Sequence, residues 1–285
     1  MASLAVSLRR SARKHPVLAF LAVSFASSWA YGVVFLRFVD PVVEYPLSQI
    51  LSLPFAWGPL VGAVAVVAAT TDTSARAWLR DAVDVSVPLR WLALAFLVPV
   101  VVQDLPDLLL AASGEPVVVG ASGLPQYVLV FAFTFCLGGA LEEFGWRSFM
   151  QARLQARWGA LAAAAAVGVA WALWHLPLHA AGYTFADDSF LLFTGYLVGL
   201  SVVLAWLFNS TAGVLPAMVL HAAHNTPGVL APAEGAEPLP VLDAPIVLIA
   251  GAWLALAGVL AAVYGPNALS ESDPPTPDAP TSVDD

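Results

Sequence analysis

Two adjacent carboxylates and an arginine lie inside an otherwise apolar part of this chain. Residues 137–147 read LGGALEEFGWR and contain Glu142, Glu143 and Arg147. Ionisable side chains at membrane depth cost about 3 kcal/mol each on insertion scales, so they mark a functional site by default. A carboxylate in such a position can serve as a general base toward water.

Two further polar sets follow on separate apolar segments. Residues 171–179 read WALWHLPLH and contain His175, and residues 221–225 read HAAHN and contain His221 and Asn225. Pro177 lacks the backbone donor that would bond the carbonyl of Leu173, so we expect a kink beside His175 that makes room for water or a peptide.

Helix geometry sorts the members of these sets. Glu143 and Arg147 are four residues apart and can pair on one helix face, which lowers the cost of a charge in a low dielectric. Glu142 is rotated by about 100° from Glu143 and is the freer carboxylate. His221 and Asn225 are also four apart and can point at one spot.

The elements that must position these residues are membrane helices. The 285-residue chain is 60% hydrophobic and 11% charged, with a mean hydropathy of +0.81, which leaves too little polar surface for a soluble globule. We expect an all-α, polytopic helix bundle in the lipid bilayer. Its net charge of -9 argues against a nucleic-acid partner. About eight spans of roughly 20 residues fit the sequence, near residues 17–39, 48–70, 89–111, 125–148, 160–181, 190–208, 213–231 and 244–264.

The basic residues predict the orientation, since basic loops stay in the cytoplasm. The first apolar run continues past a possible signal-peptide cleavage region at 26–28, so we interpret it as a retained anchor. We therefore expect a protein of the cell membrane with both termini in the cytoplasm. Arg37 is the one basic residue that this orientation leaves outside. We expect the helix of span four to continue through 148–158, which places the glutamates in the cytoplasmic half of the bilayer.

Composition divides the chain into five parts. Residues 1–16 form a basic cytoplasmic arm, residues 17–124 a scaffold of transmembrane helices, residues 125–231 the core that carries the motifs, and residues 232–265 the last loop and helix. Residues 266–285 form an acidic, Pro-rich tail that we expect to be disordered.

The three polar motifs together resemble those of a known family. Glu-Glu-x-x-x-Arg, aromatic-x-x-x-His and His-x-x-x-Asn, in this order on successive membrane helices, look like the CPBP family of intramembrane proteases, which includes the type II CAAX prenyl endopeptidases and bacteriocin-processing relatives. The resemblance covers about residues 125–230, with Trp171 where the family usually has Phe.

The resemblance implies hydrolysis of a membrane-associated peptide at the cytoplasmic half of the membrane. Glu142 would be the general base, while His175, His221 and Asn225 would hold the water and the developing oxyanion. The family has been described both as metalloproteases and as metal-independent glutamate proteases. His175 and His221 with a carboxylate could also form a zinc site, and the sequence leaves both mechanisms open.

Two other functions stay open at this point. The protein could be a catalytically silent family member that acts as a membrane scaffold or immunity factor. It could instead be a proton-coupled transporter that uses Glu142 and Glu143 together with Asp104 and Asp107, which are one turn apart.

Several smaller features have simpler interpretations. Gly58 with Gly62, and Gly195 with Gly199, fit close helix packing. The Gly-Ala-Ser-Gly run at 120–123 resembles the nucleophile motif of rhomboid proteases, but a turn accounts for it better. His179 and His224 lie near the motif histidines as supporting candidates, and the lone Cys136 excludes an intrachain disulfide.

Overall fold

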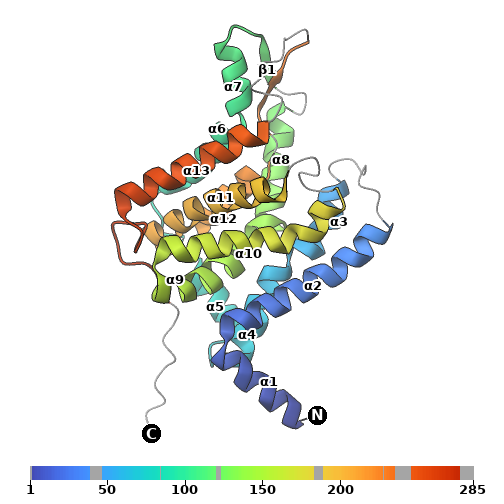
Figure 1. Cartoon of the computed structure of the whole chain (residues 1–285), viewed down its shortest axis with the longest axis vertical. Coiled ribbons are helices and arrows are strands. Elements are labelled where there is room, and N and C mark those ends of the chain that lie inside the picture. The colour runs from blue at the N-terminus through green and yellow to red at the C-terminus, as the bar shows by residue number, and fades with distance from the viewer. Residues whose placement is uncertain are drawn as a thin grey trace.

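The computed structural model is a bundle of helices (Figure 1) and describes residues 2–38, 47–83, 85–119, 123–182, 189–226, 228–234 and 245–276. Its first part comprises α1 (Ala2–Lys14), α2 (Pro16–Phe38), α3 (Leu47–Ala56), α4 (Gly58–Thr70), α5 (Ala75–Ala82), α6 (Leu89–Gln103), α7 (Leu105–Ala112) and β1 (Val117–Val119). Its second part comprises α8 (Gly123–Cys136), the 3₁₀ turn η1 (Gly139–Leu141), the π-helix η2 (Phe144–Gln151), α9 (Ala152–Trp158), α10 (Ala160–Ala180), α11 (Phe190–Thr211), α12 (Leu215–His224), β2 (Leu230–Pro232) and α13 (Pro245–Tyr264).

The polytopic helical fold predicted from composition is confirmed, but the count of eight spans is not. The described residues contain six helical runs that are long and apolar enough to cross a membrane, and a seventh if α6 and α7 form one bent span. The predicted span at 213–231 fails because α12 has only ten residues. At 1.5 Å per residue it is about 15 Å long, half of a hydrocarbon core.

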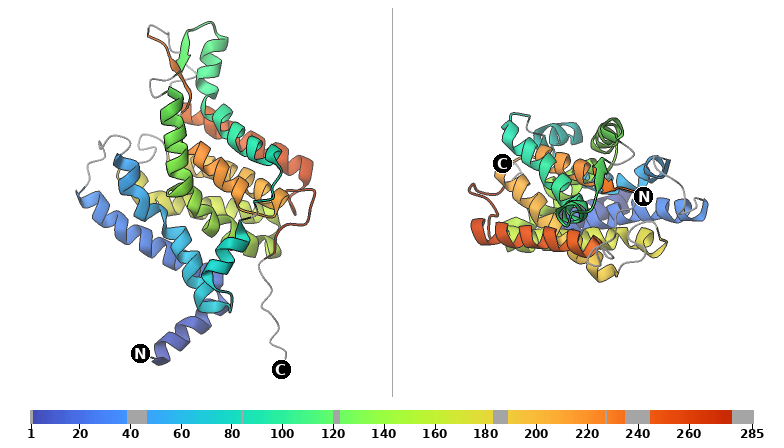
Figure 2. Two further views of the ribbon diagram at one scale, coloured as in Figure 1. Left: turned by 180° about the vertical axis from the view of Figure 1, so that it is seen from behind. Right: turned by 90° about the horizontal axis from the view of Figure 1, so that it is seen from above.

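A contact with Asp104 accounts for the path of the chain after α12. Asp104 is buried where α6 and α7 meet at a 59° bend, and its Oδ1 accepts a hydrogen bond from the backbone N–H of Leu230 at 3.1 Å. A Cβ at Gly228 would lie 2.5 Å from the same oxygen, so glycine permits the close approach. Strand β2 then pairs antiparallel with β1, and this ribbon and α7 project from the bundle (Figure 2).

The predicted fourth helix is interrupted at the motif glutamates. Helix α8 ends at Cys136, η1 makes a single turn, and the chain then enters η2 before regular helix resumes in α9. Single-turn π-helical segments occur often at functional sites. Apolar periodicity does not reveal such breaks, because the segment is apolar on both sides of them.

Small residues let the helices approach closely, as predicted for Gly58, Gly62 and Gly199 but not for Gly195, whose ideal Cβ lies 3.9 Å from its nearest neighbour. A Cβ at Gly62 of α4 would lie 3.0 Å from the carbonyl oxygen of Phe20 in α2, and one at Gly199 of α11 would lie 2.8 Å from the backbone of α13. Gly145 of η2 makes a similar approach, since its ideal Cβ would lie 2.5 Å from the carbonyl oxygen of Pro59. These contacts hold α2, α4 and η2 together and pack α11 against α13.

Candidate active site

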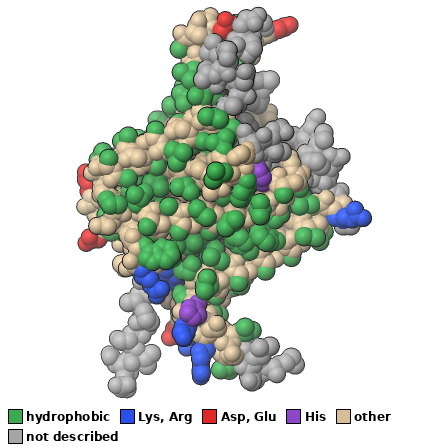
Figure 3. Space-filling model, in the orientation of Figure 1, with side chains coloured by type: hydrophobic (Ala, Val, Ile, Leu, Met, Phe, Trp, Pro, Cys, Tyr) green, Lys and Arg blue, Asp and Glu red, His purple; other side chains and the backbone are tan. Residues whose placement is uncertain are grey.

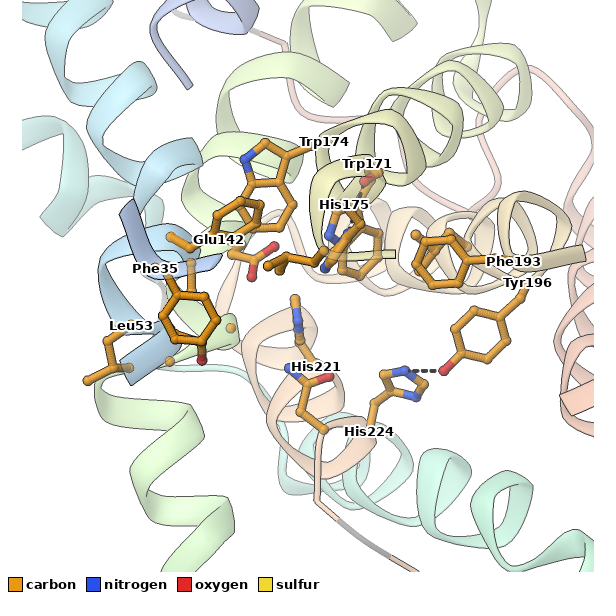
Figure 4. A pocket seen from close by; sticks show the side chains of 18 of the residues that line it. Phe35, Leu53, Glu142, Trp171, Trp174, His175, Phe193, Tyr196, His221 and His224 are labelled. Atoms are coloured by element: carbon orange, nitrogen blue, oxygen red, sulfur yellow. Dashed lines mark hydrogen bonds between the residues drawn. The ribbon is translucent and has the colours of Figure 1, made fainter. Parts of the chain in front are cut away.

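A half-open cavity of about 410 Å³ lies between the helices that carry the motifs. Its polar lining includes Glu142, His175, His221 and Asn225, which come from the segment after η1, from α10 and from the end of α12. Figure 4 shows Glu142, His175 and His221 reaching this space from different elements. The fold therefore brings four of the six predicted site residues to one cavity.

Glu142 is the carboxylate that faces the cavity. It follows η1 directly and begins the turn that leads into η2. Its side chain is buried, and its Oε2 accepts a hydrogen bond from the indole Nε1 of Trp146 at 3.1 Å. One oxygen of Glu142 is thus held by η2, while the side chain lines the cavity.

Glu143 lies outside the cavity and has both oxygens engaged. Its Oε2 accepts a hydrogen bond from Nε of Arg147 at 3.0 Å, which confirms the predicted pair. Its Oε1 lies 2.6 Å from Nδ1 of His221. Arg147 Nη1 also donates to the carbonyl and hydroxyl oxygens of Ser201, at 2.9 and 3.0 Å. Glu143 thus ties η2 to α11 and α12, with charges that are fully buried but paired.

The link to Glu143 fixes the orientation of the His221 ring. Because Nδ1 faces the carboxylate, we assign the proton to Nδ1 and leave Nε2 for the cavity. An ideal Cβ at Gly139 would lie 2.6 Å from this Nε2 and 2.5 Å from Nδ2 of Asn225. Both nitrogens are therefore within about 5 Å of each other and rest against the backbone of η1.

His175 is held in a similar way on α10. Its Nδ1 lies 3.0 Å from the carbonyl oxygen of Trp171. A carbonyl oxygen only accepts hydrogen bonds, so Nδ1 carries the ring proton and Nε2 is unprotonated. The ring packs edge-on against Trp174, with ring centroids 4.6 Å apart, and against Phe193 at 5.7 Å. Helix α10 continues through Pro177 to Ala180. The aromatic residue that departs from the family pattern, Trp171, lines the cavity and lies 5.0 Å from the ring of His221.

The residues present do not fit a zinc site. A catalytic zinc takes three protein ligands, and nowhere in the described part of the chain do three His, Cys, Asp or Glu side chains come together as such a group. His175 and His221 line the same cavity but do not gather with a third ligand. The metalloprotease alternative gains no support from this arrangement, and we derive no step through a metal.

Sequence reasoning missed Gly139, Tyr196 and Gln103, which line the cavity. Tyr196 Oη lies 2.5 Å from Nε2 of His224, whose carbonyl oxygen accepts a hydrogen bond from Gln103 Nε2 at 2.8 Å. His224 thus lines the cavity. The sequence had suggested it only as a supporting candidate. The Gly-Gly pair before the glutamates was the available signal for Gly139, whereas nothing in the sequence singled out Tyr196.

Other residues considered from the sequence lie elsewhere. His179 stacks on the ring of Phe193 with centroids 5.6 Å apart and does not line the cavity. Asp104 and Asp107 do not line it either, and Asp104 is engaged by Leu230. Residues 120–122 of the rhomboid-like run fall outside the described residues. Cys136 is exposed at the end of α8.

His175 lies far from the basic end of its helix, whereas Glu142 lies near the middle of the run Pro125–Trp158. In α10, His175 is about 22 Å along the helix from Ala160, which follows the arginines of α9, and only about 8 Å from Ala180. Cytoplasmic basic loops would therefore place His175 in the opposite half of the bilayer from the one that we predicted for the active site. That prediction treated 125–158 as one continuous helix, whereas the helix is interrupted at the motif glutamates.

The fold and the cavity define a polytopic helical membrane protein with a buried carboxylate and histidine site. Residues 124–227 match the family model described as type II CAAX prenyl endopeptidase Rce1-like. This segment contains all three polar motifs, so the resemblance noted from the sequence is confirmed over these residues. No curated protein matches the chain.

Proposed function

We propose that the protein is an intramembrane endopeptidase in which Glu142 is the general base. The observation that carries the proposal is the division between the two adjacent carboxylates. Glu142 faces a cavity that also contains His175, His221 and Asn225, whereas Glu143 is occupied by Arg147 and His221. The match to an endopeptidase family over this segment supports the same reaction class.

The reaction follows from the groups at the cavity. Glu142 takes a proton from a water molecule as the water oxygen attacks the carbonyl carbon of the peptide bond. The Nδ2–H of Asn225 donates a hydrogen bond to the oxyanion that develops. The unprotonated Nε2 atoms of His175 and His221 are acceptors that orient the water. The proton then passes from Glu142 to the amide nitrogen as the C–N bond breaks. The products are a new carboxylate and a new amine.

Glu143 supports this chemistry without touching the substrate. Its carboxylate holds Nδ1 of His221 at 2.6 Å, so the imidazole keeps one orientation and any positive charge on it is compensated. Arg147 in turn holds Glu143. We therefore propose Glu143 and Arg147 as positioning residues, with a membrane-associated peptide as substrate in the cell membrane.

The test is a comparison between the wild type and Glu142→Gln. The amide keeps the shape of the side chain but cannot accept a proton, so turnover should be lost while the fold is kept. Mass spectrometry of membrane peptides from cells with either protein should reveal a peptide that accumulates only with Glu142→Gln. The purified wild type should cleave that peptide. Glu271→Gln, the same change at an exposed position outside the cavity, is the control.

Three outcomes would oppose the proposal. Normal peptide turnover by Glu142→Gln would end the general-base assignment. A phenotype of the protein that survives Glu142→Gln, with no peptide accumulating, would favour a catalytically silent scaffold or immunity factor. Uptake of a solute by proteoliposomes would favour the transporter.

A further inference from the structure

Most of the helices around the cavity contribute the same end to it, whereas Gly138, Gly139 and Glu142 come from the middle of the run Pro125–Trp158. In the antiparallel pair α10 and α11, its lining comes from the last residues of α10, such as His175 and Leu178, and from the first turns of α11, such as Phe193 and Tyr196. Phe193 is about 5 Å along the helix from Phe190 and about 27 Å from Thr211. The cavity therefore lies in one half of the bundle.

Three other elements agree with this placement. Helix α2 contributes Phe35, one turn before its end at Phe38. Helix α3, the first part of the span that runs into α4, contributes Ser52 and Leu53. Helix α6 contributes its last residue, Gln103. Each element thus reaches the cavity at the end that is remote from α1, α5 and α9.

The basic residues gather at the opposite ends. Helix α1 precedes the start of α2, α5 lies between the end of α4 and the start of α6, and α9 precedes the start of α10. Figure 3 shows basic side chains toward the lower edge of the molecule, below a broad hydrophobic band. Of the eleven Lys and Arg residues, nine lie in or beside α1, α5 and α9, namely Arg9, Arg10, Arg13, Lys14, Arg76, Arg80, Arg90, Arg153 and Arg157.

The two remaining arginines do not change this pattern. Arg147 is fully buried and paired with Glu143, so it is not part of a loop. Arg37 is exposed near the end of α2, at the cavity end, and is the one exception. The distribution of nine to one is a strong orientation signal, because basic segments close to membrane helices are retained in the cytoplasm.

We propose that the cavity opens to the non-cytoplasmic side of the membrane and receives its substrate from there. Given the proposed function, on which this part rests, the substrate is an exported or membrane-anchored peptide whose scissile bond lies in the outer half of the bilayer. A peptide presented at the cytoplasmic surface would meet the basic end of the bundle, where α1, α5 and α9 contribute no lining residue to the cavity. The loading side itself follows from the fold and the charges, independently of the reaction.

The test uses single cysteines and a thiol reagent that does not cross membranes. In a Cys136→Ser background, Ser52→Cys and Leu53→Cys place a thiol in the cavity wall, and Ala156→Cys places one on the exposed side of α9. Intact cells and inside-out vesicles are treated with a trimethylammonium methanethiosulfonate. The thiols that remain free are then counted with a maleimide mass tag after denaturation.

The cavity cysteines should be blocked several-fold faster in intact cells than in inside-out vesicles, and Ala156→Cys should show the reverse. Blocking of the cavity cysteines only in inside-out vesicles would overturn the proposal. Protection from both sides, while a permeant maleimide still reacts, would also overturn it, since a cavity closed to outer water cannot be loaded from there. No turnover is needed, so normal cleavage by Glu142→Gln would refute the proposed function and leave this result standing.

Discussion

A methyl group at Gly139 should disable the site while leaving the protein folded. The ideal Cβ of Gly139→Ala lies 2.5 Å from Asn225 Nδ2 and 2.6 Å from His221 Nε2, whereas ordinary contacts begin at 3.4 Å. Both nitrogens must therefore retreat by close to 1 Å. His221 has little freedom to do so, because Glu143 holds its Nδ1 at 2.6 Å. A misplacement of about 1 Å at a reacting centre can cost about 100-fold in rate.

We therefore expect kcat to fall about 100-fold in Gly139→Ala, with KM changed by less than about threefold, because the change displaces groups that act on the transition state. The assay is cleavage, by protein purified in detergent, of the membrane peptide that accumulates in cells with Glu142→Gln. Thermal unfolding of the same samples reports any overpacking, which typically costs about 1–3 kcal/mol.

Gly258→Ala is the matched control, since nothing lies within 4 Å of an added Cβ there. It should keep both kcat and stability. A folded Gly139→Ala protein with wild-type kcat would refute the argument that His221 and Asn225 act together above η1. A rise in KM alone would show instead that Gly139 makes room for the substrate.

Two other predictions concern Glu143 and the metal. Glu143→Gln leaves Arg147 buried without its carboxylate, so the free energy of unfolding should fall by about 3–5 kcal/mol. Glu142→Gln should change thermal stability far less. Equal losses in the two variants would contradict the division of roles. Protein stripped by chelators should keep its turnover, because the described residues do not offer three grouped ligands. Recovery of lost activity by added zinc, together with near-stoichiometric metal in the untreated protein and its loss on replacing His175 or His221, would refute that prediction.

The sequence by itself determined the class of protein and the residue types of the site. A chain this apolar must fold as membrane helices, and the three polar motifs stand out because ionisable groups are costly in that setting. Spacing within one helix also sufficed for the pair of Glu143 with Arg147, since residues four apart are neighbours on any helix. Spacing also sufficed to identify Glu142 as the freer carboxylate, because it is rotated by about 100° from Glu143 around the helix.

Only the tertiary structure decided how these local units meet. The bond from Glu143 to His221 joins residues 78 positions apart, and the contact of Gly139 with both nitrogens depends on how η1 packs against α12. The bend at Asp104 and the chain that follows α12 likewise meet in a long-range contact, in which the backbone N–H of Leu230 donates to Oδ1 of Asp104. Periodicity cannot predict such contacts, because it records which face of a helix is apolar and not which helix faces it. For that reason the sequence located the glutamates only along their own segment, and the fold decided which residues of α10 and α12 meet them.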